Sequence, residues 1–199
     1  MAHSNDPVIL LDHGEGNLGD EAMLVNVMCG LSEAFGNKVR FRVTSPSDRF
    51  GRCLAQRDDV ERVPSPNVCC RVTRGPLAWL LDKAWRWNLR KRVRRYLRPW
   101  IAGRLARRLA AAVSGDAGDM CDRLTAALAT SDAVHIVGGG YLNDVWADTM
   151  IWPKWALVRA AKTLDKPVFV TGQGLGPLEG RRNRRAVREI AQGADLFTL

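Results

Sequence analysis

The sequence lacks the features that would place it among membrane, secreted or zinc-stabilised proteins. No apolar run approaches the ~18 residues of a membrane-spanning helix, and residues 1–7 lack the basic and then apolar pattern of a signal peptide. Five cysteines, at positions 29, 53, 69, 70 and 121, form no C-x-x-C pair. Neither a disulfide framework nor a structural zinc site is therefore predicted. We expect a cytoplasmic protein that binds no metal.

Common catalytic signatures are absent as well. The sequence has no G-x-x-x-x-G-K-[ST], which excludes a P-loop NTPase, and no G-x-S-x-G or H-E-x-x-H. These absences argue against the commonest hydrolases and metalloproteases. The three histidines lie far apart, and His135 falls within an apolar segment. We predict that His135 is a core residue rather than a ligand.

What the sequence does contain is an alternation of apolar strands, glycine-rich loops and helices. Strands are predicted at residues 8–11, 39–43, 60–63, 133–137, 167–171 and 195–199, and helices at 20–35, about 150–164 and 181–192. In the first helix we expect Ala22, Val25, Met28 and Cys29 on the core face. The alternation predicts an α/β fold: a Rossmann-like parallel sheet with helices on both faces.

The chain stops at Leu199, inside an apolar run with no closing turn or helix. A buried strand that ends so abruptly leaves its covering layer incomplete. We expect an N-terminal Rossmann-like domain spanning residues 1–199, with a C-terminal domain missing.

The first glycine-rich loop, residues 12–19, follows a predicted strand and matches the dinucleotide pattern G-x-G-x-x-G. Asp20 and Glu21 come next, in the first helical turn, where they would repel a pyrophosphate. No acid follows the second strand to hold a ribose, so NAD(P) binding is disfavoured. Two interpretations remain: a well-capped turn, or a functional loop in which Asn17, Asp20 or Glu21 contacts substrate.

Two further glycine-rich loops, residues 138–144 and 172–177, also follow predicted strands. Open parallel sheets bind ligands at the carboxyl ends of their strands. Glycines there would let the backbone approach a ligand or phosphate closely. A turn that needs a positive φ explains each loop equally well when it is taken alone.

Taken in order, these loops resemble the polysaccharide pyruvyl transferase family. The resemblance rests on Gly14-x-x-Asn17-x-Gly19-Asp20-Glu21-Ala22, Gly138-Gly139-Gly140-Tyr141-Leu142-Asn143-Asp144, Lys166-Pro167-Val168, Gly172-Gln173-Gly174-Leu175-Gly176-Pro177 and Ala194-Asp195-Leu196-Phe197-Thr198-Leu199. It runs from residue 8 to residue 199, but residues 49–130 contribute little to it.

The resemblance implies two Rossmann-like halves arranged as in GT-B glycosyltransferases, of which this chain would be the N-terminal half. It implies transfer of a pyruvyl group from phosphoenolpyruvate, a co-substrate, to two hydroxyls of a sugar as a ketal, with no cofactor. The acceptor would be a polysaccharide or a lipid-linked glycan. The donor pocket would lie mostly in a second domain beyond Leu199.

Ketal formation needs proton transfer at carbon and at each hydroxyl. We predict Asp20 as the catalytic carboxylate. Residues predicted to bind substrate are Asn17, Gly19, Glu21, Gly139, Gly140, Asp144, Gln173 and Gly174. Four arginines of the last helix are expected to form a solvated face: Arg181, Arg182, Arg184 and Arg185. The alternatives are a GT-B glycosyltransferase that uses a nucleotide sugar and a non-catalytic module that binds glycan or membrane.

Residues 71–113 are predicted to form a basic amphipathic helical insertion. Between residues 71 and 108 there are 13 Lys and Arg residues and one acid, whereas the whole chain has a net charge of +9. The residues expected to contact an anionic membrane surface are Trp85, Arg90, Arg94 and Trp100. A solvated face is the alternative, and nucleic-acid binding is not expected. The sequence does not define an oligomeric state.

Overall fold

The computed structural model describes residues 6–13, 18–45, 54, 57–66, 100 and 120–199. Of the predicted basic insertion at 71–113, it describes only Trp100. The predicted site residues Asn17, Trp85, Arg90 and Arg94 also lie outside the described residues.

A parallel sheet of six strands forms the centre of the fold, in the order β3-β2-β1-β4-β6-β8. Its strands are β1 (Val8–Asp12), β2 (Arg40–Ser45), β3 (Val60–Pro64), β4 (Ala133–Ile136), β6 (Val168–Val170) and β8 (Leu196–Phe197). Every neighbouring pair is parallel. The chain builds outward from β1 to β3 and then returns to place β4 on the other side of β1. The strand order therefore reverses between β1 and β4, as in Rossmann folds. The predicted α/β class is confirmed.

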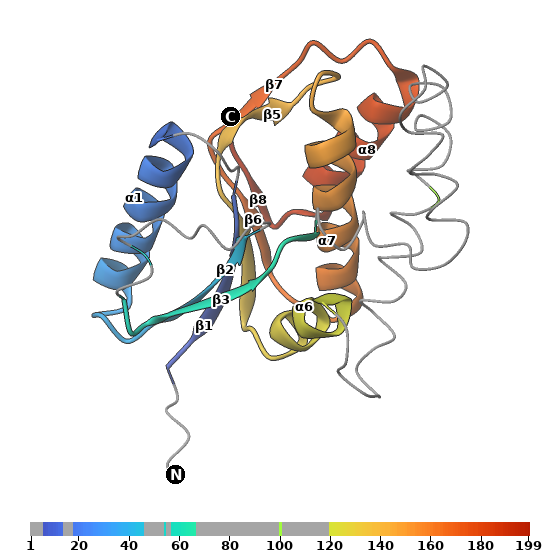
Figure 1. The fold of residues 1–199 in the computed structure, drawn as a ribbon. Helices are drawn as coiled ribbons and strands as arrows, with labels where there is room; N and C mark the ends of the chain where they lie inside the picture. Colours follow the sequence, from blue (N-terminus) through green and yellow to red (C-terminus); the bar gives the residue numbers. More distant parts are fainter. Residues whose placement is uncertain (1–5, 14–17, 46–53, 55–56, 67–99, 101–119) are drawn as a thin grey trace.

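Helices cover both faces of this sheet (Figure 1). On one side lies α1 (Leu18–Ala34), and on the other lie α6 (Met120–Ala129), α7 (Trp152–Thr163) and α8 (Arg181–Gly193). None of the helices in the described ranges is long and apolar enough to cross a membrane.

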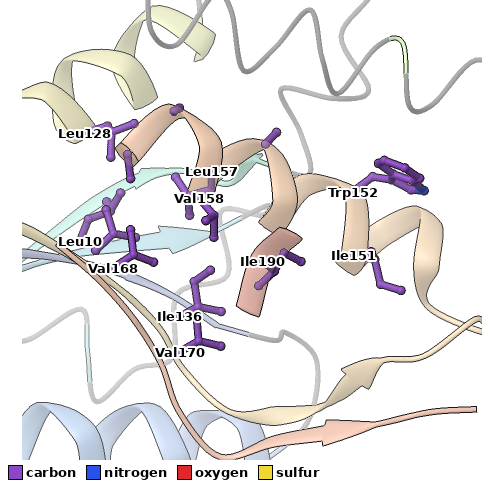
Figure 2. Packing of buried hydrophobic residues seen from close by; sticks show 14 of the residues in the cluster. Leu10, Leu128, Ile136, Ile151, Trp152, Leu157, Val158, Val168, Val170 and Ile190 are labelled. Atoms are coloured by element: carbon purple, nitrogen blue, oxygen red, sulfur yellow. The ribbon is translucent and has the colours of Figure 1, made fainter. Parts of the chain in front are cut away.

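Residues 8–11 of β1 form a continuous apolar run because both faces of the sheet are buried there. Leu10 packs in the core beneath α7, whereas its neighbours Ile9 and Leu11 pack in the core on the α1 side. Figure 2 shows the larger core, in which Leu157 and Val158 of α7 lie above the sheet.

The core face predicted for the first helix is confirmed at Met28 and at Val25, which packs against the core, but it is wrong at Ala22 and Cys29. Ala22 and Cys29 are exposed, while Asp20, Leu24 and Met28 are buried. Residues four apart lie on the same face of a helix, so the buried stripe runs through Asp20, Leu24 and Met28.

Two glycine-rich segments that the sequence analysis treats as loops contain short strands. β5 (Gly139–Leu142) and β7 (Gln173–Leu175) pair in parallel as a separate two-stranded sheet. They continue the chain beyond β4 and β6 and lie together past the end of the main sheet (Figure 1). After β5, a π-helical segment η2 (Ala147–Ile151) leads directly into α7.

Candidate functional site

The carboxyl ends of three adjacent strands, β1, β4 and β6, form the candidate site. The second and third glycine-rich segments follow β4 and β6, which pair with each other. The first loop leaves β1, which pairs with β4 on its other side. The predicted convergence on one edge of the sheet is thus confirmed for the strand ends that the structure describes. The edge includes the reversal between β1 and β4, where open α/β sheets bind their ligands.

Direct contact between two backbones explains some of the glycines at this edge. The Gly139 amide donates to the Gly172 carbonyl oxygen at 3.1 Å. A Cβ atom on Gly138 would lie 2.4 Å from that same oxygen, and one on Gly174 would lie 3.1 Å from the Cα of Gly140. Gly140 is different, because a Cβ there would meet nothing within 4 Å. Packing within the chain therefore accounts for Gly138 and Gly174 but leaves open space beside Gly140.

Gln173 carries a buried polar atom that has no hydrogen-bond partner among the described residues. The side chain is 2 % exposed, and its Nε2 donates to the Val137 carbonyl oxygen at 3.0 Å. Its Oε1 is buried and accepts no hydrogen bond from any described residue. A buried acceptor left in this state costs about 1–3 kcal/mol. A ligand hydroxyl donated to Oε1 would remove that cost.

A buried ion pair lies at the end of β1. The Lys154 ammonium, in the first turn of α7, donates to Asp12 Oδ2 at 2.7 Å, with the two side chains 2 % and 6 % exposed. The Thr44 hydroxyl, from the end of β2, donates to Asp12 Oδ1 at 2.7 Å. The Asp12 carbonyl oxygen accepts the Val137 amide at 2.7 Å. Val137 therefore connects Gln173 to the polar trio, which consists of Asp12, Thr44 and Lys154. The Val137 amide donates to the Asp12 carbonyl oxygen, and the Val137 carbonyl oxygen accepts from Gln173 Nε2.

His135 lies on the opposite face of β4 from the trio. Its Nε2 is 2.8 Å from the Thr171 hydroxyl, and its ring packs edge-on against Phe169. Burial lowers the pKa of the imidazole, because a charged ring would lose its hydration. The prediction that His135 is a core residue is confirmed: the side chain is 8 % exposed and hydrogen-bonded within the fold.

The sequence model of the polysaccharide pyruvyl transferase family matches residues 17–199. The chain belongs to the polysaccharide pyruvyl transferase family. It is thereby assigned to a family of transferases that act in polysaccharide synthesis, with a polysaccharide as the implied acceptor. No curated protein matches the chain.

The family match includes the start of α1, where three of the predicted site residues lie. Gly19 is exposed and Glu21 is half-buried. Asp20 is 4 % exposed, because it lies on the stripe that faces the core, and it interacts with other groups of the protein. Its position in the first turn of α1, directly after the first loop, keeps it at the carboxyl edge. A catalytic role for Asp20 stays a prediction.

Asp144, another predicted site residue, fixes the start of α8. Its Oδ2 accepts the Glu179 and Gly180 amides at 2.6 and 3.0 Å, and its Oδ1 accepts the Asn183 side-chain amide at 2.6 Å. Burial raises the pKa of this carboxyl group, but these hydrogen bonds and the charge of Arg184 outweigh it, so the pKa is lowered. Both oxygens therefore have partners within the fold before any sugar arrives.

The four arginines predicted to form a solvated face on α8 are exposed, and so is Trp100, which is predicted to contact a membrane surface. All four arginines, Arg181, Arg182, Arg184 and Arg185, are exposed along α8. Arg185 forms an ion pair with Glu189 at 2.8 Å, and Arg184 donates to the Leu178 carbonyl oxygen. Trp100 is 53 % exposed.

Sequence reasoning missed the polar trio. Asp12 could have been noticed, since it is the one acid that ends an otherwise apolar strand beside the glycine loop. Thr44 and Lys154 gave no comparable signal, because only the fold brings residues from β2 and α7 to the end of β1.

Proposed function

We propose that this family member transfers a pyruvyl group from phosphoenolpyruvate to two hydroxyls of one sugar. Two C–O bonds form at the central carbon of phosphoenolpyruvate while its C–O bond to phosphate breaks. One hydroxyl proton goes to the methylene carbon, which becomes a methyl group, and the other leaves with phosphate. The product is a cyclic ketal of pyruvate on the sugar.

The buried, unpartnered Oε1 of Gln173 carries the proposal. Its Nε2 is fixed on the Val137 carbonyl oxygen, so the orientation of the amide is set before a ligand binds. A ligand that binds Oε1 must supply a hydrogen-bond donor, and a sugar hydroxyl is such a donor. Gly140, on the paired strand, is exposed and has open space at its Cβ position. Asp20 at the head of α1 is the proposed carboxylate for proton transfer.

In this proposal, the described residues at the carboxyl edge of the sheet bind the sugar acceptor. Phosphate departure requires cations close to the leaving group. In this proposal they come from a second Rossmann-like half that faces this one, as in GT-B enzymes. The basic segment at 71–113 would hold the enzyme on an anionic membrane surface when the acceptor glycan is lipid-linked.

A coupled assay tests the proposal. Phosphate release is measured with phosphoenolpyruvate and a panel of glycans, and nucleotide release is measured in parallel with nucleotide sugars. Glycan-dependent phosphate release supports pyruvyl transfer. Nucleotide release without it overturns the proposal in favour of a glycosyltransferase. Lipid-linked acceptor in anionic vesicles should react faster than free glycan, and high salt should abolish the difference.

The variant Gln173→Leu tests the residue that carries the proposal. Loss of a hydrogen bond worth about 1–3 kcal/mol should raise the acceptor KM roughly 10- to 100-fold. The KM for phosphoenolpyruvate should change little. Ser131→Ala is the matched control: Ser131 is also buried and hydrogen-bonded, but it lies at the opposite edge of the sheet. An acceptor KM that changes equally in both variants would contradict the assignment.

A further inference from the structure

We infer that Asp12, Thr44 and Lys154 are positioning residues that hold the second glycine-rich segment in register with the end of β1, across the strand reversal. The trio lies where β1 and β4 diverge and spans elements far apart in sequence. Its effect on catalysis rests on the proposed function, whereas its effect on local order does not.

The energetics indicate a purpose other than stability. Burying a charged pair carries a desolvation penalty that is offset only when the remaining donors and acceptors are also satisfied. Asp12 meets this condition through Thr44, but Asp12 is the only hydrogen-bond acceptor for the Lys154 ammonium among the described residues. Well-packed apolar residues at such positions are often as stable or more stable. A chain selected for stability alone would not need these charges.

The geometry indicates what the trio positions. Asp12 is the last residue of β1, immediately before the first loop. Lys154 follows η2, which follows the turn where Asn143 Oδ1 accepts the Val145 and Trp146 amides at 2.9 and 3.1 Å. Fixing Lys154 on Asp12 therefore ties the start of α7, and through η2 the second glycine-rich segment, to the end of β1.

Two contacts restrict movement of this connection. The Thr44 hydroxyl holds the second oxygen of Asp12, so the carboxylate cannot rotate freely. The backbone carbonyl oxygen of Asp12 accepts the Val137 amide. Val137 directly precedes the glycine run of the second segment. A displacement of about 1 Å at such a site can cost 100-fold in rate.

The test separates positioning from stability by replacing the trio with apolar residues. We compare the wild type with the triple variant Asp12→Leu/Thr44→Val/Lys154→Met. The control is Lys162→Met/Asp195→Asn, which removes the other lysine–aspartate pair of α7. The triple variant should melt within about 5 °C of the wild type. Its kcat/KM for the acceptor should nevertheless fall at least about tenfold. The control should keep the kcat/KM of the wild type.

Amide hydrogen exchange gives a readout that does not need activity. In the triple variant, peptides covering residues 138–146 should exchange faster, while those covering 156–170 should not. If the wild type proves inactive, this pattern still supports the positioning role and only the proposed function fails. Unchanged exchange at 138–146 in a variant that melts like the wild type overturns the inference, whatever the activity.

A second set of variants applies if the triple variant does not fold. Lys154→Arg and Asp12→Glu keep both charges but change the length of the connection. A positioning role predicts a loss of kcat/KM and faster exchange at 138–146 in folded protein. Wild-type values of both in either variant would overturn the inference.

Discussion

Helix α7 carries a lysine–aspartate pair near each end, and the two pairs differ in burial. Lys154 meets Asp12 at the carboxyl edge of the sheet, where both side chains are almost fully buried. Lys162 meets Asp195 at the amino edge at 3.1 Å, with the two side chains 42 % and 47 % exposed. The same two residue types thus make a desolvated connection at the carboxyl edge of the sheet and a hydrated one at the amino edge.

The aspartates also differ in what else they bind. At the amino edge, Asp195 accepts the Val168 amide at 2.8 Å and Asp132 accepts the Val8 amide at 2.7 Å. Each of these acids precedes one strand and caps the first amide of a neighbouring strand. Both carboxylate oxygens of Asp12 instead accept hydrogen bonds from side chains of other elements. The aspartates at the amino edge thus each hydrogen-bond to the start of a neighbouring strand, whereas Asp12 at the carboxyl edge joins parts of the chain that are far apart in sequence.

The largest expected effect comes from removing one partner of the buried pair. Lys154→Met leaves the Asp12 carboxylate buried without its cation and should cost roughly 3–5 kcal/mol of unfolding free energy. Lys162→Met, at the exposed pair, should cost about 0–1 kcal/mol. Urea unfolding of both variants measures the difference. Equal losses would show that burial does not distinguish the two ends of α7.

A smaller effect is expected from crowding the carboxyl edge. The added Cβ of Gly138→Ala would lie 2.4 Å from the Gly172 carbonyl oxygen, a backbone atom that cannot rotate away. Overpacking of this kind should cost about 1–3 kcal/mol. Gly140→Ala, where the added atom meets open space, should leave the thermal midpoint unchanged. A Gly138→Ala protein as stable as Gly140→Ala would contradict the close backbone contact between Gly138 and Gly172.

The smallest effect concerns acid at the amino edge. The Val168 amide, and then Lys162, hold the pKa of the Asp195 carboxyl group below its usual value. A lowered folded-state pKa gives stability that is present above the unfolded value of about 3.9 and is lost as the pH falls through the folded value.

The variant Asp195→Asn isolates this contribution. It should melt slightly below the wild type at pH 7, and the gap should narrow as the pH falls below about 4. Thermal melts between pH 7 and pH 3 measure the gap. A gap of constant size would mean that the charge of Asp195 contributes nothing.

Much of the fold could be predicted from the sequence, because a strand buried on both faces is a continuous apolar run. Residues 8–11 form such a run and lie in β1, and residues 133–137, apolar except for His135, contain β4. The face of α1 was harder to predict. The sequence offers Ala22 and Cys29 as apolar positions, but the buried stripe includes the charged residue Asp20. Helical periodicity alone does not say which stripe the sheet selects.

The candidate site could be located from the sequence but not assembled. Glycines after predicted strands indicate the carboxyl edge, and Gln173 was singled out with them. Whether a glycine serves a ligand or a neighbouring backbone depends on contacts across the fold, which separate Gly140 from Gly138. Lys154 is indistinguishable in sequence from a surface lysine of α7, because its burial depends on Asp12, 142 positions away.

The glycine contact between β5 and β7 also has a dynamic consequence. With Gly138 against Gly172 and Gly174 against Gly140, no side chain separates the two backbones at these points and none can change rotamer to absorb a shift. We therefore expect β5 and β7 to move together, as one unit, relative to the end of the main sheet. A ligand that displaced β5 would therefore displace β7 and Gln173 with it.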